Sequence, residues 1–141
     1  MTISTLVDSN IILDLVGVDA VPDQRLWSSR MLLDAEEAGR ICVNAIVWAE
    51  VTQRFANGRL LRAMLQPFEC VEEDFPFAAA YPAGQAHRLY RERGGARERT
   101  LPDFLIGAHA LVAGHRLLTR DAGRYRTYFP DLDILSPETH P

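Results

Sequence analysis

Short apolar, β-branched runs alternate along the 141 residues with longer stretches of helical periodicity. Short continuous apolar runs bounded by turn residues are typical of strands that are buried on both faces. Strands that alternate with helices predict a parallel sheet with helices on both faces. Five strands are predicted, at residues 2–7, 40–43, 68–71, 116–119 and 132–135.

The segments between these runs predict helices with recognisable ends. Residues 22–38 have helical periodicity and stop at Gly39, and Asn44 is a suitable N-cap for a helix over residues 45–55. Residues 100–114 are apolar on nearly all sides, which predicts the most deeply buried helix. Further helices are predicted over residues 9–16, 59–66 and 75–93, with a helical turn after residue 121.

Length and composition indicate one globular domain over residues 1–141. The chain has no apolar run of about 18 residues and no N-terminal signal-peptide pattern, so we expect a cytoplasmic protein without a membrane span. Cys42 and Cys70 match no metal-binding or redox spacing and are expected to be buried thiols.

The net charge of −4 conceals a basic segment at residues 88–126, which has nine arginines and four acidic residues. Such a segment is compatible with a surface that binds a polyanion, and equally with a solvated helix face and a loop. All fifteen basic residues of the chain are arginine. The absence of lysine excludes a Walker phosphate-binding loop and Schiff-base chemistry.

Two aspartates lie just past predicted strands. Asp8 directly follows the first strand, and Asp121 lies two residues after the fourth. Because the carboxyl ends of parallel strands share one edge of a sheet, where binding sites form, both carboxylates are expected at that edge. Each aspartate also precedes a possible helix, so N-capping is an alternative explanation.

Two further acids occupy unusual positions. Glu50 lies too deep in its helix to cap it and shares an apolar face, although an ion pair with Arg54 is an alternative. Asp103 opens the most apolar helix, where Thr100 and Asp103 also fit a capping box.

The four acids are candidates for a shared metal site. Two carboxylates about 4 Å apart repel by ~4 kcal/mol at an effective dielectric constant of 20, which favours a bound cation. Hard oxygen ligands suit Mg²⁺ or Mn²⁺. Zinc is not expected, because the four histidines show no ligand spacing, and His109 is expected to be packed or paired locally.

The segments that carry these acids together resemble a PIN domain, and in particular the VapC-type toxins of bacterial type II toxin–antitoxin pairs. They are "VDSN" with Asp8, "VWAEV" with Glu50, "PDFLIGAHAL" with Asp103 and "LLTRD" with Asp121. The resemblance covers roughly residues 3–135. It departs from the family pattern after Asp121, where the usual "DF" is missing and the sequence reads "AGRYRTYF".

This resemblance implies a three-layer α/β/α sandwich with a mainly parallel sheet of about five strands. It implies an Mg²⁺-dependent endoribonuclease, with Mn²⁺ as a possible substitute, in which a metal-activated water hydrolyses RNA phosphodiester bonds. Asp8 and Asp103 would be the principal metal ligands, with Glu50 and Asp121 completing the acidic cluster. A VapB-type antitoxin and a homodimer are the implied protein partners. The polar positions beside the acids are Ser9, Asn10 and Thr119.

Several RNA contacts and rival functions remain open at this stage. Tyr125, Tyr128 and Phe129 are candidates for base stacking or for core packing. A nuclease of RNA maturation and a non-catalytic interaction module are the alternative functions; receivers and aspartate-nucleophile phosphatases are disfavoured because both use a lysine. The apolar side chains of residues 60–65 fit either a partner groove or the core. The candidate arginines for RNA binding are Arg97, Arg99, Arg116, Arg120 and Arg124.

Overall fold

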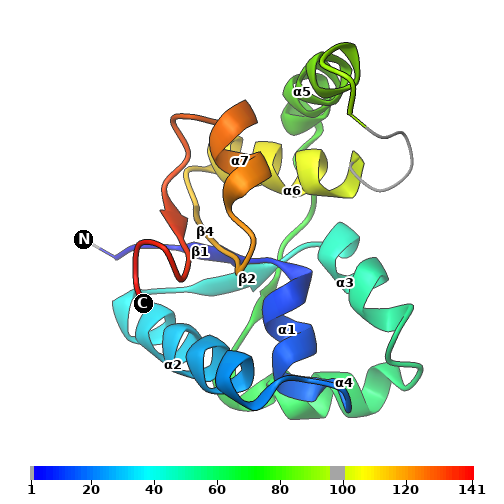
Figure 1. Ribbon diagram of the computed structural model, residues 1–141. Coiled ribbons are helices and arrows are strands. Elements are labelled where there is room, and N and C mark those ends of the chain that lie inside the picture. Colours follow the sequence, from blue (N-terminus) through cyan, green and yellow to red (C-terminus); the bar gives the residue numbers. More distant parts are fainter. Residues whose placement is uncertain (1, 96–100) are drawn as a thin grey trace.

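The computed structural model describes residues 2–95 and 101–141 and contains a five-stranded sheet in which every neighbouring pair is parallel (Figure 1). This confirms the predicted sheet. The order in the sheet is β3-β2-β1-β4-β5. The strands are β1 (Thr5–Val7), β2 (Ile41–Val43), β3 (Val71–Glu72), β4 (Arg116–Leu118) and β5 (Ile134–Leu135).

The strand order places a topological switch point at the centre of the sheet. Leu6 of β1 pairs with Cys42 of β2 on one side and with Leu117 of β4 on the other. The chain runs outward from β1 through β2 to β3 and then returns to the other side of β1 with β4. Ligands of open parallel sheets bind beyond the carboxyl ends of strands at such a point. The carboxyl ends of β1 and β4 are therefore the expected location of a site.

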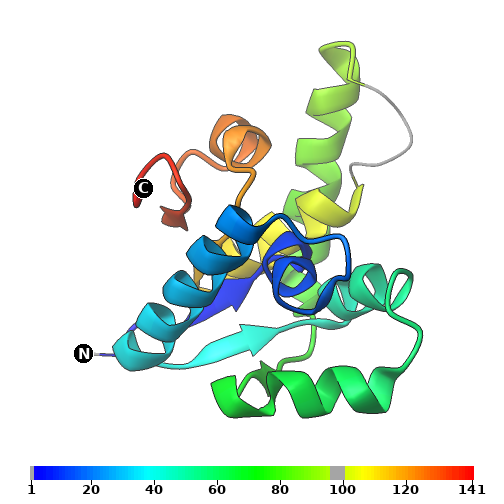
Figure 2. The ribbon, with the colours of Figure 1, turned by 60° about the horizontal axis from the view of Figure 1, so that its bottom comes forward.

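Helices cover both faces of the sheet and give the predicted three layers (Figures 1 and 2). One face carries α1, α2 and α4, the other carries α5, α6 and α7, and α3 follows β2 and contacts α1 and α6. The helices are α1 (Ser9–Val16), α2 (Pro22–Ala38), α3 (Ala45–Thr52), α4 (Gly58–Leu65), α5 (Ala80–Glu92), α6 (Leu101–Ala113) and α7 (Gly123–Tyr128).

Asparagine side chains cap the starts of two helices. The Asn44 side chain accepts a hydrogen bond from the Val47 amide at 2.9 Å and starts α3, as predicted. Asn57 accepts from the Leu60 amide at 3.0 Å and starts α4. Each cap satisfies a backbone donor that the first helical turn leaves unpaired.

Strand β3 begins later than the apolar pattern of residues 68–71 predicts. Gln66–Phe68 form a 3₁₀ turn, and Glu69 has a positive φ of 50°. Because residues 66–69 are not extended, pairing with β2 begins only at Val71. The predicted strand exists but is displaced toward the C-terminus.

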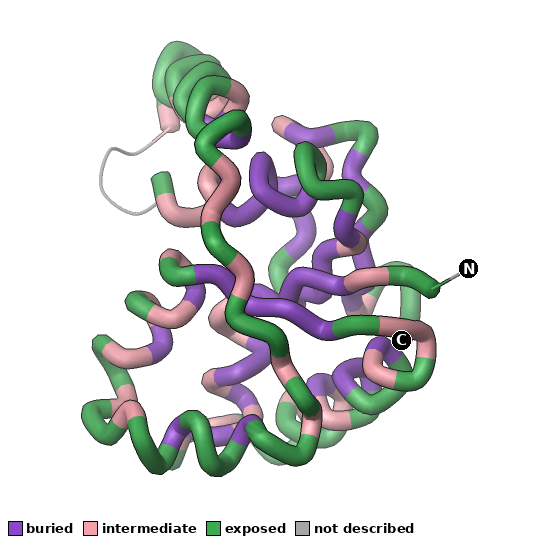
Figure 3. Tube along the Cα trace, turned by 180° about the vertical axis from the view of Figure 1, so that it is seen from behind, coloured by how far each residue is buried: buried purple, intermediate pink, exposed green. Residues whose placement is uncertain are grey.

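The core lies on both faces of the central strands (Figure 3). Leu61 and Leu65 of α4 are buried in it, whereas Leu60 and Met64 remain 49% and 40% exposed. The apolar segment of α4 therefore divides between core and surface. None of the described helices is long and apolar enough to cross a bilayer.

Gly107 lets α7 approach α6 closely. A Cβ atom at this position would lie 2.6 Å from the Phe129 ring and 3.1 Å from the Tyr125 ring. Without that atom, the Tyr125 and Phe129 rings pack directly on α6. This approach brings Arg124 and Tyr125 to Asp103, at the start of α6.

Candidate functional site

Asp8 is both the N-cap of α1 and a buried carboxylate at the carboxyl end of β1. Its Oδ1 accepts from the Ser9 amide at 2.7 Å. Its Oδ2 accepts from the Thr119 hydroxyl and from the Tyr125 hydroxyl, each at 2.9 Å. Burial, followed by the charge of Asp103, raises the pKa of Asp8 from 3.8 to about 6, although these three hydrogen bonds lower it. A role as N-cap therefore explains the hydrogen bond to one oxygen of Asp8. It does not explain why this carboxylate is buried beside a second acid, which is what raises its pKa.

Asp103 lies in the first turn of α6 and faces Asp8 across one hydroxyl group. The Tyr125 oxygen, which bonds to Asp8, is 3.5 Å from Oδ1 of Asp103. The Arg124 guanidinium donates to Oδ2 of Asp103. Burial raises the pKa of Asp103, the Arg124 contact lowers it, and the charge of Asp121 raises it. Asp8 and Asp103, the predicted principal metal ligands, are thus brought close together. The positive charge beside them is the guanidinium group of Arg124.

Glu50 on α3 joins the same electrostatic cluster. Burial, followed by the charges of Asp8 and Asp103, raises the pKa of Glu50 from 4.5 to about 7. Its Oε1 is buried and has no hydrogen-bond partner among the described residues. No ion pair joins it to Arg54 in that part of the chain. The surface-pair alternative for Glu50 is therefore not realised.

Asp121 follows β4 and is exposed at the edge of the cluster. It does not cap α7, because the N-cap position is Ala122 and carries no side-chain hydrogen bond. Its charge acts on Asp103. Asp121 is thus the most solvated of the four acids. The capping box predicted for Thr100 and Asp103 involves a residue, Thr100, that lies outside the described part of the chain.

The polar residues beside the acids form a chain of hydrogen bonds centred on Thr119. The Thr119 hydroxyl donates to Asp8 and accepts from the Asn10 side-chain amide and the Asp121 backbone amide, both at 3.1 Å. The Asn10 carbonyl oxygen accepts from the Arg120 amide at 3.2 Å. Ser9 contributes its backbone amide. These contacts tie the loop after β4 to the start of α1 and hold the Asp8 carboxylate in one orientation.

The acidic cluster is open rather than closed. Among the described residues, the only three metal-ligating atoms that lie within 4.8 Å of one another belong to Cys42, Glu73 and His115, away from the four acids. Mg²⁺ usually keeps several waters and takes only one or two carboxylates directly. An open set of carboxylates, one of them with an unpartnered buried oxygen, therefore fits a hydrated divalent cation better than a fully enclosed ion.

The arginines predicted to bind RNA have different surroundings. Arg120 forms a two-point ion pair with Asp14, at 2.6 and 3.0 Å, and Arg124 contacts Asp103. Arg116 begins β4, at the opposite end of that strand from the acids, and its buried Nε has no partner among the described residues. The predicted contacts at positions 97 and 99 lie outside the described residues.

The sequence pattern predicts neither the role of Tyr125 nor the location of Arg54. Tyr125 and Phe129 are buried at 2% and 4% exposure, which favours core packing over base stacking. Yet the Tyr125 hydroxyl also bonds to Asp8. Arg54 and Arg120 line one hollow beside Asn10. The departure from "DF" in the segment after Asp121 is the signal in the sequence that points to Tyr125.

The fold and sequence resemble known proteins over most of the chain. The profile of a family described as PIN domain matches residues 5–130. A chain of VapBC2 from Rickettsia felis, bound to a DNA fragment from its promoter, is 18% identical with a TM-score of 0.71, covering 95% of this chain and 98% of that one. A chain of FitAcB from Neisseria gonorrhoeae is 20% identical with a TM-score of 0.62 and the same coverages. No curated protein sequence matches.

A third structure extends the same likeness. A chain of a toxin–antitoxin complex from Klebsiella pneumoniae is 21% identical with a TM-score of 0.65, covering 94% of this chain and 97% of that one. At these identities the likenesses establish the fold. The chemistry depends on the residues of this chain.

Proposed function

Because the chain belongs to the PIN-domain family, we propose that it is a metal-dependent endoribonuclease that uses Asp8, Glu50, Asp103 and Asp121. The observation that carries this proposal is the convergence of carboxylates from separate elements. Asp8 and Glu50 have pKa values raised to about 6 and about 7, in part by the charges of neighbouring acids. Strongly perturbed carboxylates grouped at a switch point are typical of functional sites.

The residues present fit Mg²⁺, with Mn²⁺ as a substitute. Asp8 and Asp103 would hold the cation, and Glu50 and Asp121 would hold its waters or a second ion. The donor set consists only of hard oxygens, and the unpartnered Oε1 of Glu50 supports the need for a cation. A divalent cation held there would lower the pKa of water and stabilise charge on phosphate oxygens.

The protein's own side chains position the reaction. Thr119 and Tyr125 hold Oδ2 of Asp8, while the Ser9 amide holds Oδ1. Glu50, whose pKa is raised to about 7, is the carboxylate best suited to accept the proton of an attacking water. Arg54 and Arg120, in the hollow beside Asn10, are suited to contact the RNA backbone.

The proposal is tested by RNA cleavage with the purified chain. We expect cleavage of single-stranded RNA in Mg²⁺ or Mn²⁺, complete loss in excess EDTA, and recovery when Mn²⁺ is restored. Cleavage that is indifferent to EDTA would exclude the metal mechanism. A folded chain that binds RNA without cutting it in either metal would instead favour a non-catalytic module. The contact of Arg124 with Asp103 is the observation in the structure that supports this alternative.

Arg124 is expected to oppose metal binding. In Arg124→Gln we expect Mg²⁺ to bind roughly tenfold more tightly, because a unit charge beside a ligand carboxylate repels a nearby divalent ion by about 1 kcal/mol or more even in water. The measurement is the Mg²⁺ dependence of Tm. Arg126→Gln is the matched control, since Arg126 lies on the same helix but pairs with Glu138. Identical Mg²⁺ titrations for Arg124→Gln and the wild type would contradict this role.

We further propose that the chain is a single PIN domain that acts as the toxin of a VapBC-type pair in the cytoplasm. Similar structures named as VapBC, FitAcB and a toxin–antitoxin complex support this role. Its partners would be a VapB-type antitoxin and a second copy of the chain. A nuclease of RNA maturation would use the same chemistry without the antitoxin.

A further inference from the structure

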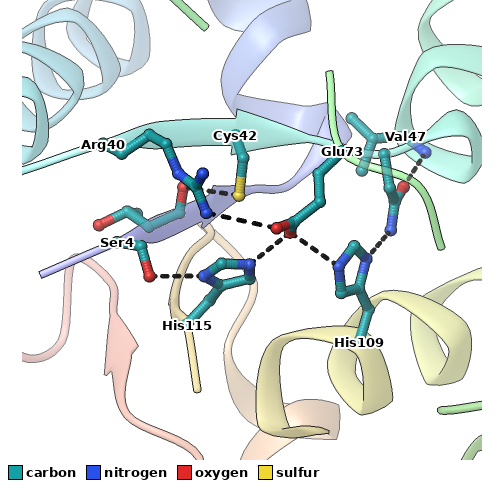
Figure 4. A network of polar contacts seen from close by, with 9 residues as sticks. Ser4, Arg40, Cys42, Val47, Glu73, His109 and His115 are labelled. Atoms are coloured by element: carbon teal, nitrogen blue, oxygen red, sulfur yellow. Dashed lines mark hydrogen bonds and ion pairs between the residues drawn. The ribbon is translucent and has the colours of Figure 1, made fainter. Parts of the chain in front are cut away.

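A second cluster of chemically active side chains contains Cys42, Glu73, His109 and His115 (Figure 4). Cys42 belongs to β2, Glu73 directly follows β3, His109 belongs to α6 and His115 directly precedes β4. Asp121 lies beyond the carboxyl end of β4, whereas His115 lies before its amino end. The two clusters are therefore at opposite ends of that strand. The second is called here the His–Glu–Cys cluster.

Glu73 is the centre of this cluster. Its Oε2 contacts Nε2 of His109 at 3.0 Å and also contacts Nε2 of His115. Its Oε1 lies 3.3 Å from Arg40, which is half exposed. Burial raises the pKa of Glu73, but hydrogen bonds and charge from His115 and His109 lower it overall. Glu73 is therefore an ionised carboxylate held between two imidazoles.

The α3 cap fixes the proton of His109. Oδ1 of Asn44 accepts from the Val47 amide, so the amide nitrogen of Asn44 is the atom that faces Nδ1 of His109 at 2.9 Å. That nitrogen can only donate, so Nδ1 must accept and the proton of neutral His109 resides on Nε2. His109 is thus a donor to Glu73 and has no lone pair available for a metal at Nε2.

In contrast to His109, the neighbours of His115 do not fix which of its ring nitrogens carries the proton. Its Nδ1 lies 2.6 Å from the Ser4 hydroxyl, which can donate or accept by rotating. When Ser4 accepts from Nδ1–H, the lone pair of His115 resides on Nε2 and faces Glu73. The ring is 5% exposed and cannot turn away. For His115 to change from a hydrogen-bond donor into a ligand, its ring keeps its place in the core while the Glu73 carboxylate moves aside to admit the ion between them.

The sulfur of Cys42 completes a set of three ligand atoms. One atom each from Cys42, Glu73 and His115 lies within 4.8 Å of the other two. The thiol is fully buried, and its present contact is a weak one to the Thr5 carbonyl at 3.5 Å. We propose that these three side chains form a zinc-binding site, with His109 as the outer donor that orients the Glu73 carboxylate.

The chemistry of these groups favours Zn²⁺ over Mg²⁺. Thiolate, imidazole and carboxylate are the usual ligands of zinc, and three protein ligands leave a fourth position for water. Carboxylates that ligate a metal are themselves usually hydrogen-bonded, and His109 supplies such a bond to Glu73. Burial and Glu73 raise the pKa of the Cys42 thiol to about 12, so zinc must displace a proton from this thiol and is expected to bind more tightly as the pH rises. The product is a neutral set of Zn²⁺, thiolate and carboxylate.

A route from solvent reaches this set. A hollow lined by Asn44, Glu73 and Phe75 opens at the surface, and the Glu73 side chain is 27% exposed. The other two ligands are buried behind it. An ion can therefore reach the carboxylate first without unfolding of the sheet. This site is independent of the proposed nuclease, since it shares no residue with the four acids.

Cobalt binding to the metal-free full chain tests the proposal. Co²⁺ bound to a thiolate gives an intense near-ultraviolet charge-transfer band, which an all-oxygen site cannot give. We expect this band to saturate at one equivalent of Co²⁺ and to disappear when Zn²⁺ is added. The band should persist in Asp103→Asn, which leaves the acidic cluster impaired and the cysteine intact.

The two cysteines supply the matched control. Cys42→Ser should abolish the band, and Cys70→Ser should leave it unchanged, with circular dichroism confirming that both are folded. Glu73→Gln should weaken Co²⁺ binding by at least tenfold. A folded wild-type chain without the band at saturating Co²⁺, or a band lost in Cys70→Ser and kept in Glu73→Gln, would overturn the proposal even if Cys42→Ser failed to fold.

Discussion

Replacing Asp103 by Asn is expected to reduce RNA cleavage by more than about 100-fold while the chain stays folded. Outer partners of metal ligands typically cost 10–100-fold when they are removed, so loss of a direct ligand should cost more. Asp103 lies in the first turn of α6, and its strongest contact is the partly exposed Arg124. The substitution therefore removes a charge that the reaction requires and little that the fold requires. Initial cleavage rates in Mg²⁺ measure the effect.

Asp131→Asn provides the control for that experiment. Asp131 is an exposed acid after α7 and lies outside the acidic cluster. Its substitution makes the same change of one charge, so any general effect of net charge on RNA binding appears in both variants. If Asp103→Asn retains wild-type cleavage per folded molecule, this carboxylate only stabilises the first turn of α6 and the proposed mechanism is wrong. If both variants lose activity equally, the effect is one of long-range charge.

The sheet and the positions of its acids can be predicted because they follow local rules. Buried parallel strands read as short apolar runs, and an acid just past such a run must lie near the sheet edge whatever the details of packing. This rule places Asp8 and Asp121. Asn44 is identifiable as a cap from its place between an apolar run and a helix. Such signals extend over only a few neighbouring residues, and the sequence displays them directly.

The contacts that join distant segments cannot be predicted in the same way. Spacing argues against any cysteine or histidine metal site, yet the fold brings Cys42 together with Glu73 and His115. The sequence predicts local packing or pairing for His109, and the residue is indeed paired, but with partners on other elements. These pairings depend on how α6 crosses the sheet. No period or spacing within one segment encodes that crossing.

Tyr125 and Arg124 show a third kind of limit. The departure from "DF" is visible in the sequence, but its consequence is not. Only the close approach of α7 at Gly107 shows that Tyr125 reaches Asp8 and that Arg124 reaches Asp103. A residue type that departs from a family pattern is thus a useful signal of altered chemistry. The direction of the change follows only from the packing.

In the metal-free protein, the carboxylate of Asp8 is expected to make stability fall as the pH rises. Its pKa is about 6 in the folded chain and 3.8 ordinarily, so between these values the folded state binds more protons than the unfolded state. The stability present below pH 4 is lost progressively as the pH rises through 6. A shift of this size corresponds to about 3 kcal/mol in total, of which about 2 kcal/mol develops between pH 4 and pH 7.

The measurement is the difference in unfolding free energy between the wild type and Asp8→Asn in EDTA, taken at each pH. His109 acts in the opposite direction, because burial lowers its pKa and stability is lost as the pH falls. The subtraction removes that contribution, which both proteins share.

The new side-chain amide in Asp8→Asn would leave a hydrogen facing Thr119 or Tyr125, so the variant should be the less stable protein at pH 4. The gap should narrow or reverse by pH 7, and Mg²⁺ should restore the advantage of the wild type, by ~2.7 kcal/mol at a hundred times its dissociation constant. A difference that stays constant from pH 4 to pH 7 would mean that Asp8 is an ordinary cap, with no crowding of charge for a cation to relieve.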